Sequence, residues 1–366
     1  MKNWYAMNFH KFTFREIKGR GEIATDMKKS VIPPFFPFGD DTIVENRRFE
    51  YQIAVPEKMQ RNINGKATSV IILFHGLNER SWDKYYPWAS YISNSTGKPV
   101  LLFPAAFHIN RAPAPWSESR TMQRFVSEEK EASERERHLT FLNYALSKRI
   151  EADPFRFYLA GRESINNVCQ IVEEIRKGKH PLIESDAKID IFAYSIGVLM
   201  AHVLLLANPG NFFTTTKLFA FCGGSVFNRM NGDSRMIMDR NSFRALVDYY
   251  SNRFIYYKDE KRLKGDALEH AFICHIDSFL YREQREDFYR ESSSRIRILA
   301  LRQDKVIPTD GIVDALGDEH KKSLQEIDFP FPYTHENPFG ALAFKEGLEK
   351  NVWFRNVFDR VSEFLG

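Results

Sequence analysis

Short apolar runs separated by longer amphipathic or charged stretches are the main pattern along this chain. Runs with the length and composition of strands occur at 48–55, 69–74, 98–103, 189–193, 217–222, 295–301 and 323–327. Helical spacing or long apolar runs occur at 82–92, 164–177, 198–207 and 351–365. The charged stretch 121–150 predicts a solvated helix, and 154–159 predicts a short strand or an extended link. Because strands alternate with helices, the pattern predicts an α/β fold with a mostly parallel central sheet flanked by helices.

The junction at Ser195 is the most informative local feature. The apolar run 189–193 ends at Tyr194-Ser195-Ile196-Gly197, and an apolar helical pattern follows at once. A strand, a tight turn with Ser at its apex and a helix, with small residues two positions to either side, form the nucleophile-elbow pattern. Ala193 stands where this pattern usually has Gly. The alternative interpretation is that Ser195 only caps the helix that follows it.

Three further polar residues follow predicted strands. Asp304 comes directly after 295–301, and His335 lies between the last predicted strand and the C-terminal helix. His75 and the glycine after it end the strand at 69–74. The alternatives are that Asp304 caps a helix that begins near Pro308, and that His335 packs among loop aromatics.

In this order, these residues resemble the α/β-hydrolase superfamily over about 48–366. The resemblance implies that Ser195 is the nucleophile, His335 its base and Asp304 the acid that orients His335. It also implies that the N–H groups of Leu77 and Ile196 hold the oxyanion. The function that it implies is hydrolysis of an ester, thioester or amide through an acyl-enzyme. An acyltransferase and a non-catalytic binding protein on the same fold are the alternatives.

The chain divides into an expected core and two additions. We expect 48–224 and 295–366 to form the α/β-hydrolase core. Residues 1–47 include a proline-rich stretch that excludes a regular helix, and they predict an N-terminal arm packed on the body. Residues 225–294 show no clear strand, are too long for a simple connection and are rich in aromatics, so they predict an inserted helical lid. The alternative is a structural insertion that touches no substrate.

Candidate substrate contacts lie in loops that leave the carboxyl ends of predicted strands, where α/β proteins bind ligands. These residues are His75, Asn78, His108, Arg111 and Trp116. Since Arg offers a fork of donors matched to a carboxylate or phosphate, we predict that Arg111 faces the pocket and binds a polar or anionic end of the substrate. Its alternative partner is an acid of the same loop, such as Glu118. The aromatic lid favours a small-molecule substrate with an apolar part.

The composition of the chain limits the partners and cofactors that we expect. Among the 366 residues, 52 Lys and Arg face 48 Asp and Glu, and no dense basic block occurs, so nucleic acid is not an expected partner. The three cysteines, Cys169, Cys222 and Cys274, are far apart, so we expect neither disulfides nor a metal site, and we expect no cofactor. No apolar run is long enough to span a bilayer and no signal-type segment begins the chain, so a cytoplasmic location is expected. The oligomeric state stays open.

Overall fold

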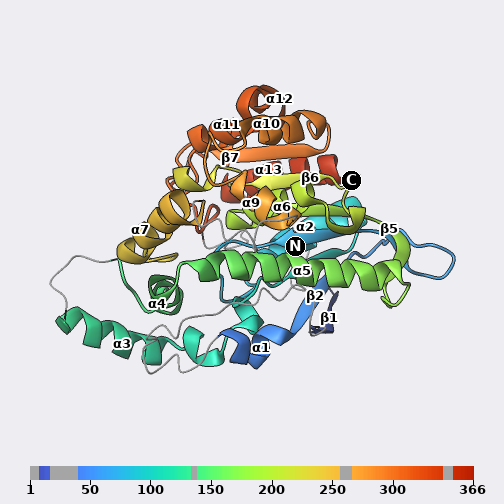
Figure 1. Cartoon of the computed structure of the whole chain (residues 1–366). Coiled ribbons are helices and arrows are strands. Elements are labelled where there is room, and N and C mark those ends of the chain that lie inside the picture. The colour runs from blue at the N-terminus through green and yellow to red at the C-terminus, as the bar shows by residue number, and fades with distance from the viewer. Residues whose placement is uncertain (1–7, 17–39, 133–137, 256–265, 341–348) are drawn as a thin grey trace.

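A single mixed sheet forms the centre of the structure, a computed structural model (Figure 1). The structure describes residues 8–16, 40–132, 138–255, 266–340 and 349–366. The sheet has eight strands in the order β1-β2-β4-β3-β5-β6-β7-β8. The strands are β1 (Asn8–Arg15), β2 (Arg48–Val55), β3 (Ala67–Phe74), β4 (Val100–Phe103), β5 (Ile183–Tyr194), β6 (Leu218–Phe221), β7 (Ile296–Leu301) and β8 (Leu324–Ile327). β1, β2 and β4 pair antiparallel, and every pair from β4 to β8 is parallel, as the sequence predicted.

Helices cover both faces of this sheet. The longer ones are α2 (Tyr85–Thr96), α3 (Ser119–Ala132), α4 (Tyr144–Ala152), α5 (Phe155–Arg176), α6 (Ile196–Ala207), α7 (Arg240–Tyr249), α9 (Ala267–Ile273), α10 (Arg282–Glu291), α11 (Thr309–Leu316) and α13 (Glu349–Leu365). The single-turn helices are α1 (Val44–Arg47) and α12 (His320–Ser323). In Figure 1 the long helix α5 runs across one face of the sheet, and α2 and α13 lie on the opposite face.

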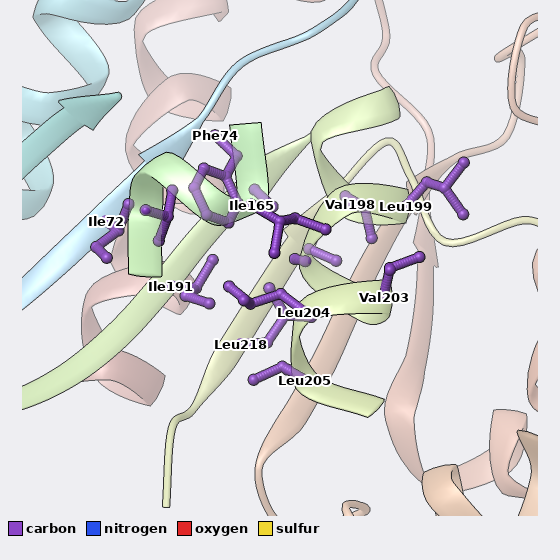
Figure 2. Close-up of a cluster of buried hydrophobic side chains, with 14 of the residues drawn as sticks. Ile72, Phe74, Ile165, Ile191, Val198, Leu199, Val203, Leu204, Leu205 and Leu218 are labelled. Carbon is purple, nitrogen blue, oxygen red and sulfur yellow. The ribbon is translucent and has the colours of Figure 1, made fainter. Parts of the chain in front are cut away.

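Each face of the sheet has its own apolar core. On β5, Ile191 and Ala193 belong to the core shared with α5 and α6, whereas Phe192 and Tyr194 belong to the core shared with α2 and α13. Figure 2 shows the first of these cores, where Ile191 lies among side chains of α6. Because successive strand residues point to opposite faces and both faces are covered, the central strands are continuous apolar runs.

The helices around α5 differ from the predicted pattern. The prediction of an extended segment at 154–159 was wrong, because α5 begins at Phe155. Pro154 precedes it with a helical φ of −60°, and the Asp153 carboxylate accepts from the Phe155 N–H at 3.0 Å. The predicted helix over 121–150 is divided into α3 and α4.

Two segments outside the predicted core contact it closely. Asn8–Arg15, from the predicted arm, forms the edge strand β1 and pairs with β2 over its whole length. The other arm residues up to 39, apart from residue 16, lie outside the described residues. The described part of 225–294 contributes helices and adds no strand to the sheet. Its helix α9 packs on α6, and Phe272 of α9 contacts Tyr158 of α5 with ring centroids 5.2 Å apart.

Candidate active site

Ser195 lies at a sharp turn between β5 and α6. Its φ of 58° and ψ of −129° are rare for a residue with a side chain, and such backbone strain is concentrated at functional sites. Two positions later, a Cβ on Gly197 would lie 2.7 Å from the carbonyl oxygen of His75 and 2.8 Å from that of Phe74. A glycine is therefore required for the first turn of α6 to approach the end of β3. Ala193 fits in the core despite the usual Gly at this position.

Hydrogen bonds join Ser195, His335 and Asp304. Ser195 follows β5, His335 follows β8 and Asp304 follows β7. Ser195 Oγ is 2.6 Å from His335 Nε2, and His335 Nδ1 is 2.7 Å from Asp304 Oδ2. All three residues are at most 5% exposed. A neutral imidazole that donates from Nδ1 to the carboxylate presents an acceptor at Nε2 to the hydroxyl, which is the arrangement of a general base.

Asp304 is held by the loop that follows β7. Its Oδ1 accepts hydrogen bonds from the backbone N–H groups of Val306 and Ile307, both at 2.9 Å. These donors favour the ionised carboxylate and fix its direction. The alternative role as a cap for α11 is not observed, because the residue before that helix is Pro308 and no side chain caps it.

The N–H groups of Leu77 and Ile196 have the environment expected of oxyanion donors. Both residues line the same cavity, and neither N–H donates to an acceptor in the described part of the chain. His75 fixes the loop that carries Leu77: its Nε2 accepts from the Ala105 N–H at 2.9 Å, so its Nδ1 donates to the Gly76 carbonyl at 2.7 Å. Burial lowers the pKa of His75 to about 4, so its ring is neutral.

The cavity beside these donors has a volume of about 90 Å³ and is mainly apolar. α5 contributes Phe157 and Ile165 to its wall, and α6 contributes Met200. Leu268 and Phe272 come from α9, so the inserted segment contacts the space next to the candidate nucleophile.

The other predicted substrate contacts divide between two places. His108 lines the cavity, donates from Nδ1 to the Ala106 carbonyl at 2.8 Å and is neutral, because burial lowers its pKa to about 3. Asn78 and Trp116 line a second, smaller cavity. The amide of Asn78 donates to the carbonyls of Leu142 at 2.9 Å and Met236 at 2.7 Å.

The prediction that Arg111 faces the pocket was wrong. Its side chain is fully buried and lies 4.0 Å from the centre of the Phe49 ring. Nη2 bonds to Glu163 Oε1 at 3.0 Å and to Asn167 Oδ1 at 2.8 Å, and Nε bonds to Asn46 Oδ1 at 3.0 Å. The main chain adds acceptors at the carbonyls of residues 46 and 104. Because its donors are satisfied inside the fold, Arg111 ties the loop after β4 to α1 and α5.

A network of residues that the sequence did not point to connects the two halves of the site. Lys84 forms an ion pair with Glu79 and donates to the carbonyl of Glu336 at 3.0 Å. Tyr85 Oη accepts from the Gly76 N–H at 2.9 Å and donates to Glu79 Oε1 at 2.7 Å. Tyr194 Oη donates to the carbonyl of His335. The loop that carries Leu77 (the predicted oxyanion loop) and the loop that carries His335 (the histidine loop) are therefore linked. In the sequence, nothing distinguishes Lys84 from an ordinary surface residue before a helix.

Two features are absent from the described part of the chain. No group of three or more His, Cys, Asp or Glu side chains there could hold a metal ion. None of the helices in the described ranges combines the length and the apolar character needed to cross a membrane.

The sheet order, the strained Ser195 and the chain order of Ser195, Asp304 and His335 define an α/β-hydrolase fold. The chain belongs to a family described as a family of unknown function (DUF6051), which matches residues 23–366. A search of curated proteins found no match.

The solved structures that match this chain have very different sequences. A mutant of the esterase rPPE has 10% identity and a TM-score of 0.49, with 100% of this chain and 86% of that chain covered. A hyperthermophilic esterase from the archaeon Pyrobaculum calidifontis has 11% identity and a TM-score of 0.47, with 98% and 82% covered. The acylaminoacyl peptidase of Pyrococcus horikoshii has 14% identity and a TM-score of 0.43, with 98% and 41% covered.

Proposed function

We propose that this protein is a serine hydrolase that cleaves an ester, thioester or amide through an acyl-enzyme. The observation that carries the proposal is the continuous pair of hydrogen bonds from Ser195 Oγ through the imidazole of His335 to Asp304 Oδ2, at 2.6 and 2.7 Å. A serine that only capped α6 would not need this geometry, and its side chain caps no backbone N–H of that helix.

In the proposed reaction, Ser195 Oγ attacks the substrate carbonyl while His335 Nε2 takes the hydroxyl proton. Asp304 stabilises the resulting imidazolium, and its own charge is supported by two backbone N–H donors. The negative charge on the carbonyl oxygen is held by the N–H groups of Leu77 and Ile196. His335 then donates its proton to the leaving group, and water releases the acyl group from Ser195 by the same steps in reverse order.

The apolar cavity fits the acyl half of the substrate. His335 must protonate the leaving group, so the leaving group lies on the His335 side of the carbonyl. Among the described residues, the cavity wall includes Leu77 and Ile196 but no residue of the Asp304 and His335 loops. The cavity is therefore on the opposite side, where its aliphatic and aromatic wall favours an apolar acyl chain.

Labelling with a fluorophosphonate probe tests the proposal without knowledge of the substrate, because the probe reacts with an activated serine. The wild-type protein is expected to be labelled, and Ser195→Ala to be unlabelled. His335→Ala should also lose labelling while its thermal unfolding stays cooperative. A folded wild-type protein that does not react would contradict the proposal.

A further inference from the structure

A second cavity, of about 30 Å³, lies beside the first, and His108 lines both. Its wall includes Asn78 and Arg80, which continue the oxyanion loop from Leu77, and Trp116. Since Leu77 lines the first cavity and Asn78 the second, the two spaces meet at the loop that holds the oxyanion donors. A group bound in the second cavity is therefore close to the reacting carbonyl.

Arg80 is one of four arginines with a buried side-chain nitrogen that has no acceptor among the described residues, but the other three, Arg149, Arg156 and Arg162, each form an ion pair. The guanidinium of Arg80 forms no hydrogen bond or ion pair with any described residue, and Nη1 is buried without an acceptor. Its guanidinium lies 5.9 Å from the centre of the Phe141 ring, and the charge of the neighbouring Glu79 acts on it without direct contact. Arg111, in contrast, has an acceptor on each of its nitrogens. A buried guanidinium nitrogen without an acceptor is costly unless a ligand or water supplies one.

The charges around this cavity are positive in balance. Arg149 is 4% exposed, and its guanidinium lies 4.2 Å from the Phe107 ring and 4.8 Å from the Trp116 ring. Its partner, Asp40, is shared with Arg156. Glu79 also lines the cavity, but its carboxylate is already engaged by Lys84 and by the Tyr85 hydroxyl. Among the described residues around this cavity, the guanidinium of Arg80 is therefore the one that no acid contacts, and it is the candidate to bind an added anion.

We propose that the second cavity binds a carboxylate group through the guanidinium of Arg80. The planar fork of Arg matches the two oxygens of a carboxylate, and the aromatic wall holds the ligand in the plane of the fork. The carboxylate belongs either to the substrate or to a free small anion. The first source rests on the proposed function and extends it to an acyl compound with an apolar acyl chain and a carboxylate. The second source is independent of catalysis.

Matched substrates test the first source. Phenyl butyrate is compared with p-carboxyphenyl butyrate, and p-nitrophenyl valerate with the mono-p-nitrophenyl ester of glutarate, so that the carboxylate is on the alcohol side in one pair and on the acyl side in the other. Arg80→Met is expected to lower kcat/KM for one of the carboxylate esters about tenfold or more and to leave both neutral esters unchanged. Arg80→Lys should restore part of the loss. Arg290→Met, which removes an exposed arginine of α10, is the control and should change neither pair.

Thermal unfolding with succinate, against sodium chloride at equal ionic strength, tests the second source. An increase in Tm with succinate that is present in Ser195→Ala and lost in Ser195→Ala/Arg80→Met supports a free carboxylate. If the wild-type protein neither reacts with a fluorophosphonate nor hydrolyses any ester but shows this shift, the proposed function fails and the anion site stands. If esters are hydrolysed and neither the carboxylate preference nor the shift depends on Arg80, the anion site is refuted and the cavity holds water only.

Discussion

The Asp304→Asn substitution should change the tautomer of His335 while it leaves the packing of the loop after β7 intact. Asp304 Oδ1 accepts from the N–H groups of Val306 and Ile307, and Oδ2 accepts from His335 Nδ1. The oxygen of an Asn would keep the two backbone bonds, which turns its NH₂ group toward His335. The ring must then accept at Nδ1 and carry its proton on Nε2, where it cannot take a proton from Ser195.

The wrong tautomer removes the general base, which costs about 10⁴-fold in kcat, or about 5 kcal/mol in the activation free energy. KM should change little, since the acyl cavity is not touched. Kinetics with p-nitrophenyl butyrate give both constants, and thermal unfolding should give a Tm close to that of the wild-type protein. Asp310→Asn, which changes a side chain of α11 that is 69% exposed, is the control. Turnover within tenfold of the wild-type value in Asp304→Asn would refute the proposed tautomer control.

Three further changes test other parts of the structure. Arg111→Met leaves Glu163 and its polar neighbours without their cation, so we expect a loss of about 3 kcal/mol in the free energy of unfolding by urea titration, and equal effects on charged and neutral substrates. Because burial lowers the pKa of His75 to about 4, the unfolded state binds a proton first as the pH falls below 6.5. The contribution of His75 to stability is then fully present above pH 6.5 and decreases by up to about 3 kcal/mol toward pH 4, and His75→Gln should make the slope less steep by this amount in urea titrations at successive pH values, while buried His108 keeps its own contribution. Lys84→Met should lower kcat about tenfold with little change in KM, and Lys84→Arg should recover part of the activity, since a cation between the oxyanion and histidine loops is restored; equal kcat in both variants would contradict this role.

Patterns of short range predicted much of the fold and the central part of the site. The central strands are continuous apolar runs because the sheet is covered on both faces, and this is why their positions were readable. Ser195 was readable because a nucleophile elbow is contained in a few consecutive residues. The predicted pairing of Ser195 with His335 and Asp304 depended on chain order and on the strand ends that they follow. The structure brings these side chains within hydrogen-bond distance.

The direction in which a loop side chain points could not be predicted from such short-range patterns. Arg111 was expected at the pocket because of its position after a strand, but the loop turns its guanidinium into a set of acceptors from α1 and α5. Arg80 and Lys84 belong to no sequence motif, and the roles proposed for them depend on the residues that surround them in the fold. Likewise, β1 is far from the other strands in sequence, and only its pairing with β2 makes it part of the sheet.

Periodicity and turn chemistry act between near neighbours, so the α/β class, the elbow at Ser195 and the chain order of the candidate catalytic residues could be predicted without the structure. The burial of Arg111, the lack of an acceptor for Arg80 Nη1 among the described residues and the link between the loops of Leu77 and His335 became visible only in the tertiary structure. These outcomes depend on hydrogen-bond partners and charges brought together from distant parts of the chain, and the free energy of burying a polar group is fixed by those partners rather than by the residue itself.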